Sequence, residues 1–100
     1  MTELRYQVIV SPEAQRQLDD ISDWWAENRR QAPGAVEADM DAAIDLLGRQ
    51  PEIAGRDRRR SDRRRLHLRR IRYHVYYTVD HARRTVEISA VRHESRPPLS

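Results

Sequence analysis

Arginine and histidine side chains gather in the second half of this 100-residue sequence. The stretch 63–79, RRRLHLRRIRYHVYYTV, begins as an arginine run and becomes an alternation of basic, aromatic and β-branched residues. Guanidinium groups bind carboxylates and phosphates in a bidentate manner, and imidazoles transfer protons near neutral pH. We therefore expect this stretch to present cations to an anionic or acidic partner.

The charge is divided unevenly along the chain. Residues 1–48 carry four arginines against ten acidic residues (net −6), and residues 49–100 carry fifteen against six (net +9), which together give +3. Such an asymmetry often steers a charged partner. The sequence contains no cysteine, which excludes disulfides, thiolate metal sites and a cysteine nucleophile. We expect no metal and no cofactor.

The first half predicts a strand followed by two helices. Residues 4–10 alternate in polarity, as a half-buried strand does. Ser11 is a good helix N-cap and Pro12 suits the first helical turn. Pro33 and Gly34 then separate two amphipathic helices, the second of which ends near Gly48. The first helix has the apolar stripe Ala14, Leu18, Ile21 and Trp25, and the second has Val36, Met40, Ala43 and Leu47.

The second half predicts three more strands. Residues 50–62 are polar and are expected to form an exposed loop. Strands follow at 65–69, at 71–79 and around 86–90, where Val86, Ile88 and Ala90 are expected to face inward. The predicted fold is α+β, with an N-terminal strand, a helical hairpin and a three-stranded antiparallel meander (β-α-α-β-β-β) in one domain, 1–100. Both helices pack on one sheet face.

The other sheet face is expected to be open and basic. Tyr76 is expected on this face, available for stacking on a base or on a partner side chain but with no preference for that role over a plain surface position. Trp24 and Trp25 are instead expected to anchor helix packing. This face carries Arg65, Arg69, Arg72, His74 and Tyr76.

Several of these pieces together resemble the ParE/RelE superfamily of bacterial toxins. They are Ser11-Pro12-Glu13-Ala14 after the first strand, the tyrosine-rich segment 72–77, and the terminal segment Val91-Arg92-His93-Glu94-Ser95-Arg96. The resemblance implies a toxin neutralised by a cognate antitoxin with an acidic amphipathic tail. RelE-like members cleave messenger RNA in the ribosome, whereas ParE-like members are associated with poisoning of DNA gyrase and with plasmid stabilisation.

The two activities need different residues. Metal-free RNA cleavage needs a general acid, a general base and cations around the phosphorus. His74 and His93 on neighbouring strands, with Arg72 and Arg96, are the candidates for such a site. The chain has no lysine and no tyrosine after Arg96, which departs from the RelE-like pattern, and arginine is a poor proton shuttle.

A non-catalytic, ParE-like gyrase inhibitor is therefore favoured. The alternatives are an mRNA endonuclease and a non-toxic nucleic-acid-binding module. Without a long apolar segment, the protein is expected to be cytoplasmic, with no membrane partner. The expected toxic surface comprises Arg65, Arg69, Arg72, His74, Tyr76, Arg92, His93 and Arg96.

Overall fold

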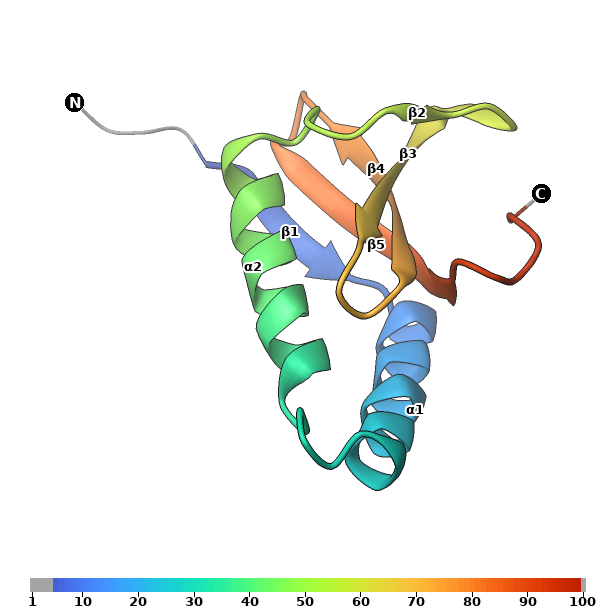
Figure 1. The fold of residues 1–100 in the computed structure, drawn as a ribbon. Helices are drawn as coiled ribbons and strands as arrows, with labels where there is room; N and C mark the ends of the chain where they lie inside the picture. The colour runs from blue at the N-terminus through green and yellow to red at the C-terminus, as the bar shows by residue number, and fades with distance from the viewer. Residues whose placement is uncertain (1–4, 100) are drawn as a thin grey trace.

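The computed structural model of the protein describes residues 5–99, so the predicted strand residue Leu4 lies outside them (Figure 1). The elements are β1 (Gln7–Val10), α1 (Pro12–Asn28), α2 (Ala35–Arg49), β2 (Arg56–Asp57), β3 (Arg60–Leu68), β4 (Tyr73–Asp80) and β5 (Thr85–His93). They form one sheet in the order β1-β5-β4-β3-β2. β1 runs parallel to β5, and the other neighbouring strands are antiparallel. The predicted α+β architecture is confirmed.

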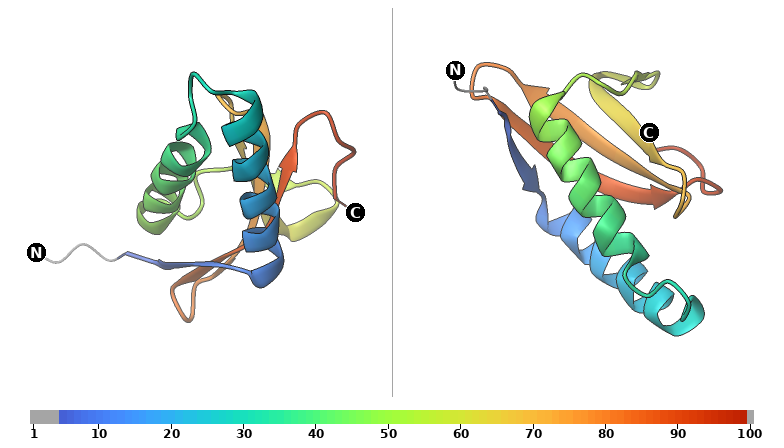
Figure 2. Two further views of the ribbon diagram at one scale, coloured as in Figure 1. Left: turned by 90° about the horizontal axis from the view of Figure 1, so that it is seen from below. Right: turned by 60° about the vertical axis from the view of Figure 1, so that its left-hand side comes forward.

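Both helices cover the same face of the sheet (Figure 2). The predicted start of α1 is confirmed, since the Ala14 N–H donates to Ser11 Oγ over 3.1 Å. The apolar stripe of α1 through Leu18 and Ile21 and that of α2 through Leu47 join one buried cluster with the inward side chains of β4 and β5. Burial of this cluster is the main stabilising contribution to the fold.

The predicted exposed loop at 50–62 is wrong in two respects. Arg56–Asp57 forms the edge strand β2, and β3 begins already at Arg60. β2 pairs antiparallel with β3, and the Arg65 N–H donates to the Gly55 carbonyl over 3.1 Å. The polar composition of this segment predicted a loop, because charged side chains are usually exposed. The strand pairing here is instead stabilised by a buried charged side chain.

That charge is Arg63, whose guanidinium forms an ion pair with Asp57. Both side chains are withdrawn from water, with 5% and 6% of their surface exposed. Arg63 Nε donates to Asp57 Oδ2 over 2.7 Å, and Nη2 donates to the Leu99 carbonyl over 3.1 Å. The same guanidinium lies 5.1 Å from the centre of the Tyr76 ring. The pair therefore ties β2, β3 and the C-terminal segment together over the outer sheet face.

A bulge in the β4–β5 pairing changes which side chains face the helices. Tyr77 pairs with Ile88 but Tyr76 pairs with Ala90, so Ser89 is an extra residue on β5. Strict alternation would have placed Ala90 in the core, as predicted. Val91 occupies the core cluster instead, and Ala90 is buried on the outer face opposite Tyr76.

Removal of one partner from the buried ion pair should strongly destabilise the fold. We expect Asp57→Ala to lower the free energy of unfolding by about 3 kcal/mol, because the Arg63 charge stays buried without its counter-ion. Urea denaturation at neutral pH measures this difference. The matched control is Asp62→Ala, which removes an exposed partner of Arg60 and should change the free energy of unfolding far less. Equal losses in the two variants would contradict the role given to the pair.

Candidate functional site

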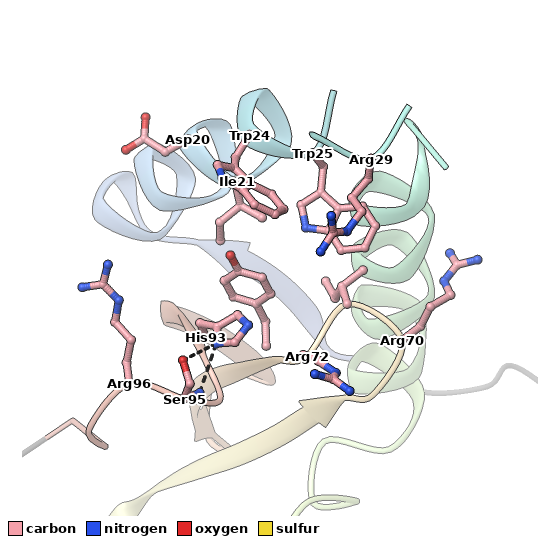
Figure 3. A pocket seen from close by; sticks show the side chains of 12 residues that line it. Asp20, Ile21, Trp24, Trp25, Arg29, Arg70, Arg72, His93, Ser95 and Arg96 are labelled. Atoms are coloured by element: carbon pink, nitrogen blue, oxygen red, sulfur yellow. Dashed lines mark hydrogen bonds between the residues drawn. The ribbon is translucent and has the colours of Figure 1, made fainter. Parts of the chain in front are cut away.

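An open pocket of about 620 Å³ lies between the second half of α1, the β3–β4 turn and the segment that follows β5 (Figure 3). Its lining includes Arg72, His93 and Arg96, three residues of the predicted toxic surface. Two tryptophans of α1 and Arg29, the C-cap residue of that helix, also line it. We call it the arginine–tryptophan pocket, defined by Trp24, Trp25, Arg29, Arg72, His93 and Arg96.

Aromatic side chains form one wall of the pocket. Trp24 and Trp25 contact edge to face, with ring centroids 6.4 Å apart. Trp24 is 47% exposed, so the expectation that it anchors helix packing is wrong. The Arg29 guanidinium lies 5.1 Å from the Trp24 ring and 5.9 Å from the Trp25 ring. This geometry combines apolar contact surface with a cation.

Three guanidinium groups border the pocket without an acidic partner. Within residues 5–99, the side chains of Arg72 and Arg96 form no hydrogen bond or ion pair, and that of Arg29 donates only to the neighbouring Asn28 carbonyl. Arg70, which also lines the pocket, is bound to Asp39 of α2 over 2.5 Å. Asp20 of α1 also lines the pocket, but among residues 5–99 it forms no ion pair with these three arginines, so positive charge predominates there.

The position of Arg72 depends on an unusual backbone conformation in the β3–β4 turn. Its φ angle is 65°, in the left-handed region that non-glycine residues avoid. The turn is closed by the Arg72 N–H, which donates to the Leu68 carbonyl over 2.8 Å. The Glu94 N–H donates to the Arg72 carbonyl over 2.9 Å, which links this turn to the segment after β5.

His93 is fixed at the pocket by the residue two positions later. The Ser95 N–H donates to His93 Nδ1 over 3.0 Å, and the Ser95 hydroxyl lies 2.7 Å from the same nitrogen. The His93 ring meets Tyr73 edge to face, with centroids 5.1 Å apart. Burial raises the pKa of the Tyr73 hydroxyl, and the Arg96 charge offsets only part of this effect.

The remaining predicted residues lie elsewhere. Register pairs His74 with Arg92 and Arg65 with Tyr76, all on the outer sheet face. His93 pairs with Tyr73 on the helix-facing side, so the proposed pairing of His74 with His93 is wrong. Arg69 lies in the β3–β4 turn, is exposed and does not line the pocket.

Tyr76 is not available for stacking, contrary to the prediction. It is 1% exposed because the Arg63 guanidinium lies over its ring. The predicted basic face is therefore only partly open.

A second cluster on the outer face centres on two histidines. His67 Nε2 lies 2.9 Å from Glu94 Oε1, and the His67 and His74 rings are 4.7 Å apart. Burial lowers the pKa of His74, and the charges of Arg65 and His67 lower it further. His74 is therefore neutral at pH 7 and chemically distinct from its neighbour.

The adjacent residues Trp24 and Trp25 are the sequence feature that indicates the α1 side of the pocket. Two adjacent tryptophans cannot both face the core of a helix that has a single apolar stripe, since neighbours on a helix are 100° apart in direction. Trp24 therefore had to point away from the stripe of Trp25, with Arg29 one turn further on.

The described part of the chain has neither a candidate metal site nor a helix that could span a membrane. No group of three histidine, aspartate or glutamate side chains among residues 5–99 is placed to hold a metal ion. None of the helices there is long and apolar enough to cross a bilayer.

Solved structures with this fold come from toxin–antitoxin systems. The toxin–antitoxin complex RelBE2 from Mycobacterium tuberculosis matches with a TM-score of 0.70 and 23% identity, covering 95% of this chain and 98% of that one. The chromosomal ParDE system from P. aeruginosa matches with a TM-score of 0.73 and 20% identity, covering 92% and 98%. The intact RelBE complex from E. coli matches with a TM-score of 0.64 and 20% identity, covering 91% and 99%.

Sequence comparison identifies the family. Comparison with the curated proteins gives no match. The family model described as the ParE toxin of the type II toxin–antitoxin system parDE matches residues 8–98, which is nearly the whole chain. The fold, the element order and this match agree, and the chain belongs to the ParE toxin family of type II toxin–antitoxin systems.

Proposed function

We propose that this toxin inhibits DNA gyrase by binding it through the arginine–tryptophan pocket, and that residues 1–100 act as one toxin domain in the cytoplasm. The observation that supports this most directly is the set of unpaired guanidinium groups beside exposed aromatic rings. Tryptophan and arginine contribute the most binding energy in protein interfaces. An acidic protein segment supplies the carboxylates that these arginines lack.

The same chemistry suits the cognate antitoxin. An acidic amphipathic tail would place apolar side chains on Trp24 and carboxylates on Arg72 and Arg96. Occupying the pocket in this way blocks access of the target, so one surface accounts for both toxicity and neutralisation.

The state of His93 favours binding over catalysis at this pocket. Because Nδ1 accepts the Ser95 N–H, the proton of the neutral ring sits on Nε2. A ring held in this tautomer presents its Nε2–H to a ligand in the pocket, while Nδ1 is engaged by Ser95. In this proposal His93 acts as a hydrogen-bond donor to the bound partner.

One observation favours the alternative, a RelE-like ribosome-dependent mRNA endonuclease. On the outer face, His67 bonded to Glu94 and the neighbouring His74 provide two imidazoles 4.7 Å apart for general acid–base catalysis, and burial lowers the pKa of His74. Arg65 and Arg92 are the nearby cations on that face. This site differs from the originally expected set of His74, His93, Arg72 and Arg96, which the bulge divides between two faces.

Loss of a pocket guanidinium should weaken gyrase inhibition without harming the fold. For both Arg72→Gly and Arg96→Ala we expect inhibition of gyrase supercoiling to need about tenfold more toxin, since a charge-assisted hydrogen bond contributes roughly 1.5–3 kcal/mol. Growth arrest on expression should weaken in parallel. Arg72→Gly also relieves the positive φ, so its free energy of unfolding should rise by about 1 kcal/mol.

Arg84→Gly is the matched control for this experiment. Arg84 has a φ of 51° in the β4–β5 turn, so glycine relieves similar strain there without removing a pocket charge. It should be stabilised and fully inhibitory. Full inhibition by both pocket variants would show that the pocket is not the toxic surface.

The tautomer of His93 can be measured directly. At neutral pH, long-range ¹⁵N–¹H NMR correlations of the imidazole should show the proton on Nε2 and an unprotonated Nδ1. The reason is that protonation of Nδ1 would remove the acceptor of the Ser95 N–H. A proton found on Nδ1 would remove this argument for a binding role.

Ribosome-containing lysates distinguish the two activities. We expect the purified toxin to leave transcripts intact, because the proposed role of the pocket is to bind a protein partner. Transcript cleavage that disappears in His74→Ala and persists in His93→Ala would instead establish the endonuclease and locate it on the outer face.

A further inference from the structure

A carboxylate, an imidazole and a phenol line up at the end of the sheet opposite the arginine–tryptophan pocket. Glu52 follows α2, His81 lies in the β4–β5 turn and Tyr6 precedes β1 (Figure 1). Glu52 Oε1 lies 3.1 Å from His81 Nε2, and His81 Nδ1 lies 2.6 Å from the Tyr6 hydroxyl. We call this arrangement the Tyr6 relay.

The direction of the protons in the Tyr6 relay follows from what each group can donate. A carboxylate only accepts hydrogen bonds, so His81 must donate from Nε2. The Nδ1 atom of the neutral ring is then an acceptor, and the Tyr6 hydroxyl donates to it. Arg64 supports this polarity, since its Nη2 lies 3.2 Å from the second oxygen of Glu52. This is the arrangement in which an imidazole activates a hydroxyl and a carboxylate orients the imidazole.

We infer that Tyr6 is a nucleophilic site that accepts one acyl group from an uncharged activated ester or thioester. This inference is independent of the proposed gyrase binding. The phenol oxygen attacks the carbonyl carbon while His81 Nδ1 takes the phenol proton. The carbon–oxygen or carbon–sulfur bond to the leaving group then breaks, and His81 returns the proton to the departing alcohol or thiol. The products are O-acyl-Tyr6 and a free alcohol or thiol, with no oxidant or reductant required.

The surroundings of Tyr6 select the substrate class. A hollow of about 500 Å³ is lined by Tyr6, Gln50, Pro51, Glu52, Ile53 and His81. Pro51 and Ile53, the latter 50% exposed, provide apolar surface for an acyl chain. None of the residues that line this hollow is an arginine, so an anionic phosphoryl donor has no counter-charge there. A neutral acyl donor fits better.

The other tyrosines provide internal comparisons. Tyr76 and Tyr77 are buried. Tyr73 meets His93 only through ring contact, and burial raises the pKa of its hydroxyl, which makes it a weaker nucleophile. Among the tyrosine hydroxyls of residues 5–99, only that of Tyr6 is bonded to a histidine nitrogen. Acylation by a small ester should therefore be selective for Tyr6.

The test uses p-nitrophenyl acetate with the purified full chain. Trypsin then releases the peptide Tyr6–Arg16, which has a single tyrosine, and mass spectrometry follows its acetylation over time. A positioned general base commonly accelerates such steps by about 10²–10⁴-fold. Because the Tyr6 relay is exposed, we expect wild-type Tyr6 to react about tenfold or more faster than Tyr6 in His81→Ala.

Matched variants distinguish activation of the Tyr6 hydroxyl by His81 from its mere exposure to the reagent. Glu52→Gln keeps the size of the side chain but removes its charge, and it should also slow the reaction. Arg83→Ala alters the same turn outside the Tyr6 relay and should react at the wild-type rate. Tyr6→Phe should abolish labelling of the peptide. Urea denaturation confirms that each variant is folded.

Equal labelling rates in wild type, His81→Ala and Glu52→Gln would overturn the inference. Labelling of Tyr73 as fast as Tyr6 would overturn it as well. If His81→Ala fails to fold, the comparison of wild type with Glu52→Gln decides. Gyrase inhibition by Tyr6→Phe should be unchanged, so failure of either proposal leaves the other intact.

Discussion

The buried ion pair between Arg63 and Asp57 is the constraint on which the outer half of the molecule depends. Burial by itself raises the pKa of Asp57, but hydrogen bonds from the Arg59 N–H and the Arg63 guanidinium outweigh it, and the pKa lies below its ordinary value. The pair therefore stabilises the fold fully above about pH 4, the usual carboxyl pKa, and this contribution is lost as the pH falls further. Burial of the Arg63 and Asp57 charges is energetically acceptable only when every hydrogen-bond partner is in place. The pair therefore requires β2, β3 and the C-terminal segment to be ordered together.

Pairing, rather than number, decides which arginines present free charge. Arg60, Arg63, Arg64 and Arg70 are neutralised within the chain by acidic side chains. The Arg70 bond to Asp39 fixes the β3–β4 turn against α2, which in turn positions Arg72. The pocket arginines lack such partners. Part of the dense arginine run is thus used within the fold, whereas Arg72 and Arg96 at the pocket have no acidic partner among the described residues.

Patterns local in sequence predicted the fold well, and contacts distant in sequence were the ones missed. Helical periodicity and the Ser11 cap located α1 and α2, because both depend on residues within one or two turns. The burial of Tyr76 depends on Arg63, thirteen residues away, and on Asp57 beyond it. Arg72 and Arg96 of the pocket were identified by their type. Arg29 and the two tryptophans were missed, because no local pattern places the end of their helix beside the β3–β4 turn.

The extra residue Ser89 reverses the alternation of side chains along β5. The Ser89 hydroxyl donates to the Tyr76 carbonyl of β4 over 3.3 Å. The N–H of Ser11, the N-cap of α1, donates to the Ile88 carbonyl over 2.9 Å. The bulge is therefore held by contacts with both β4 and the start of α1. The side chains that follow Ser89 on β5 therefore point to the sheet face opposite the one that strict alternation would give them. Insertion or deletion of a single residue here would send Arg92 to the helix side and His93 to the outer side. A toxin scaffold can thus move its chemistry from one face to the other during evolution without changing a functional residue.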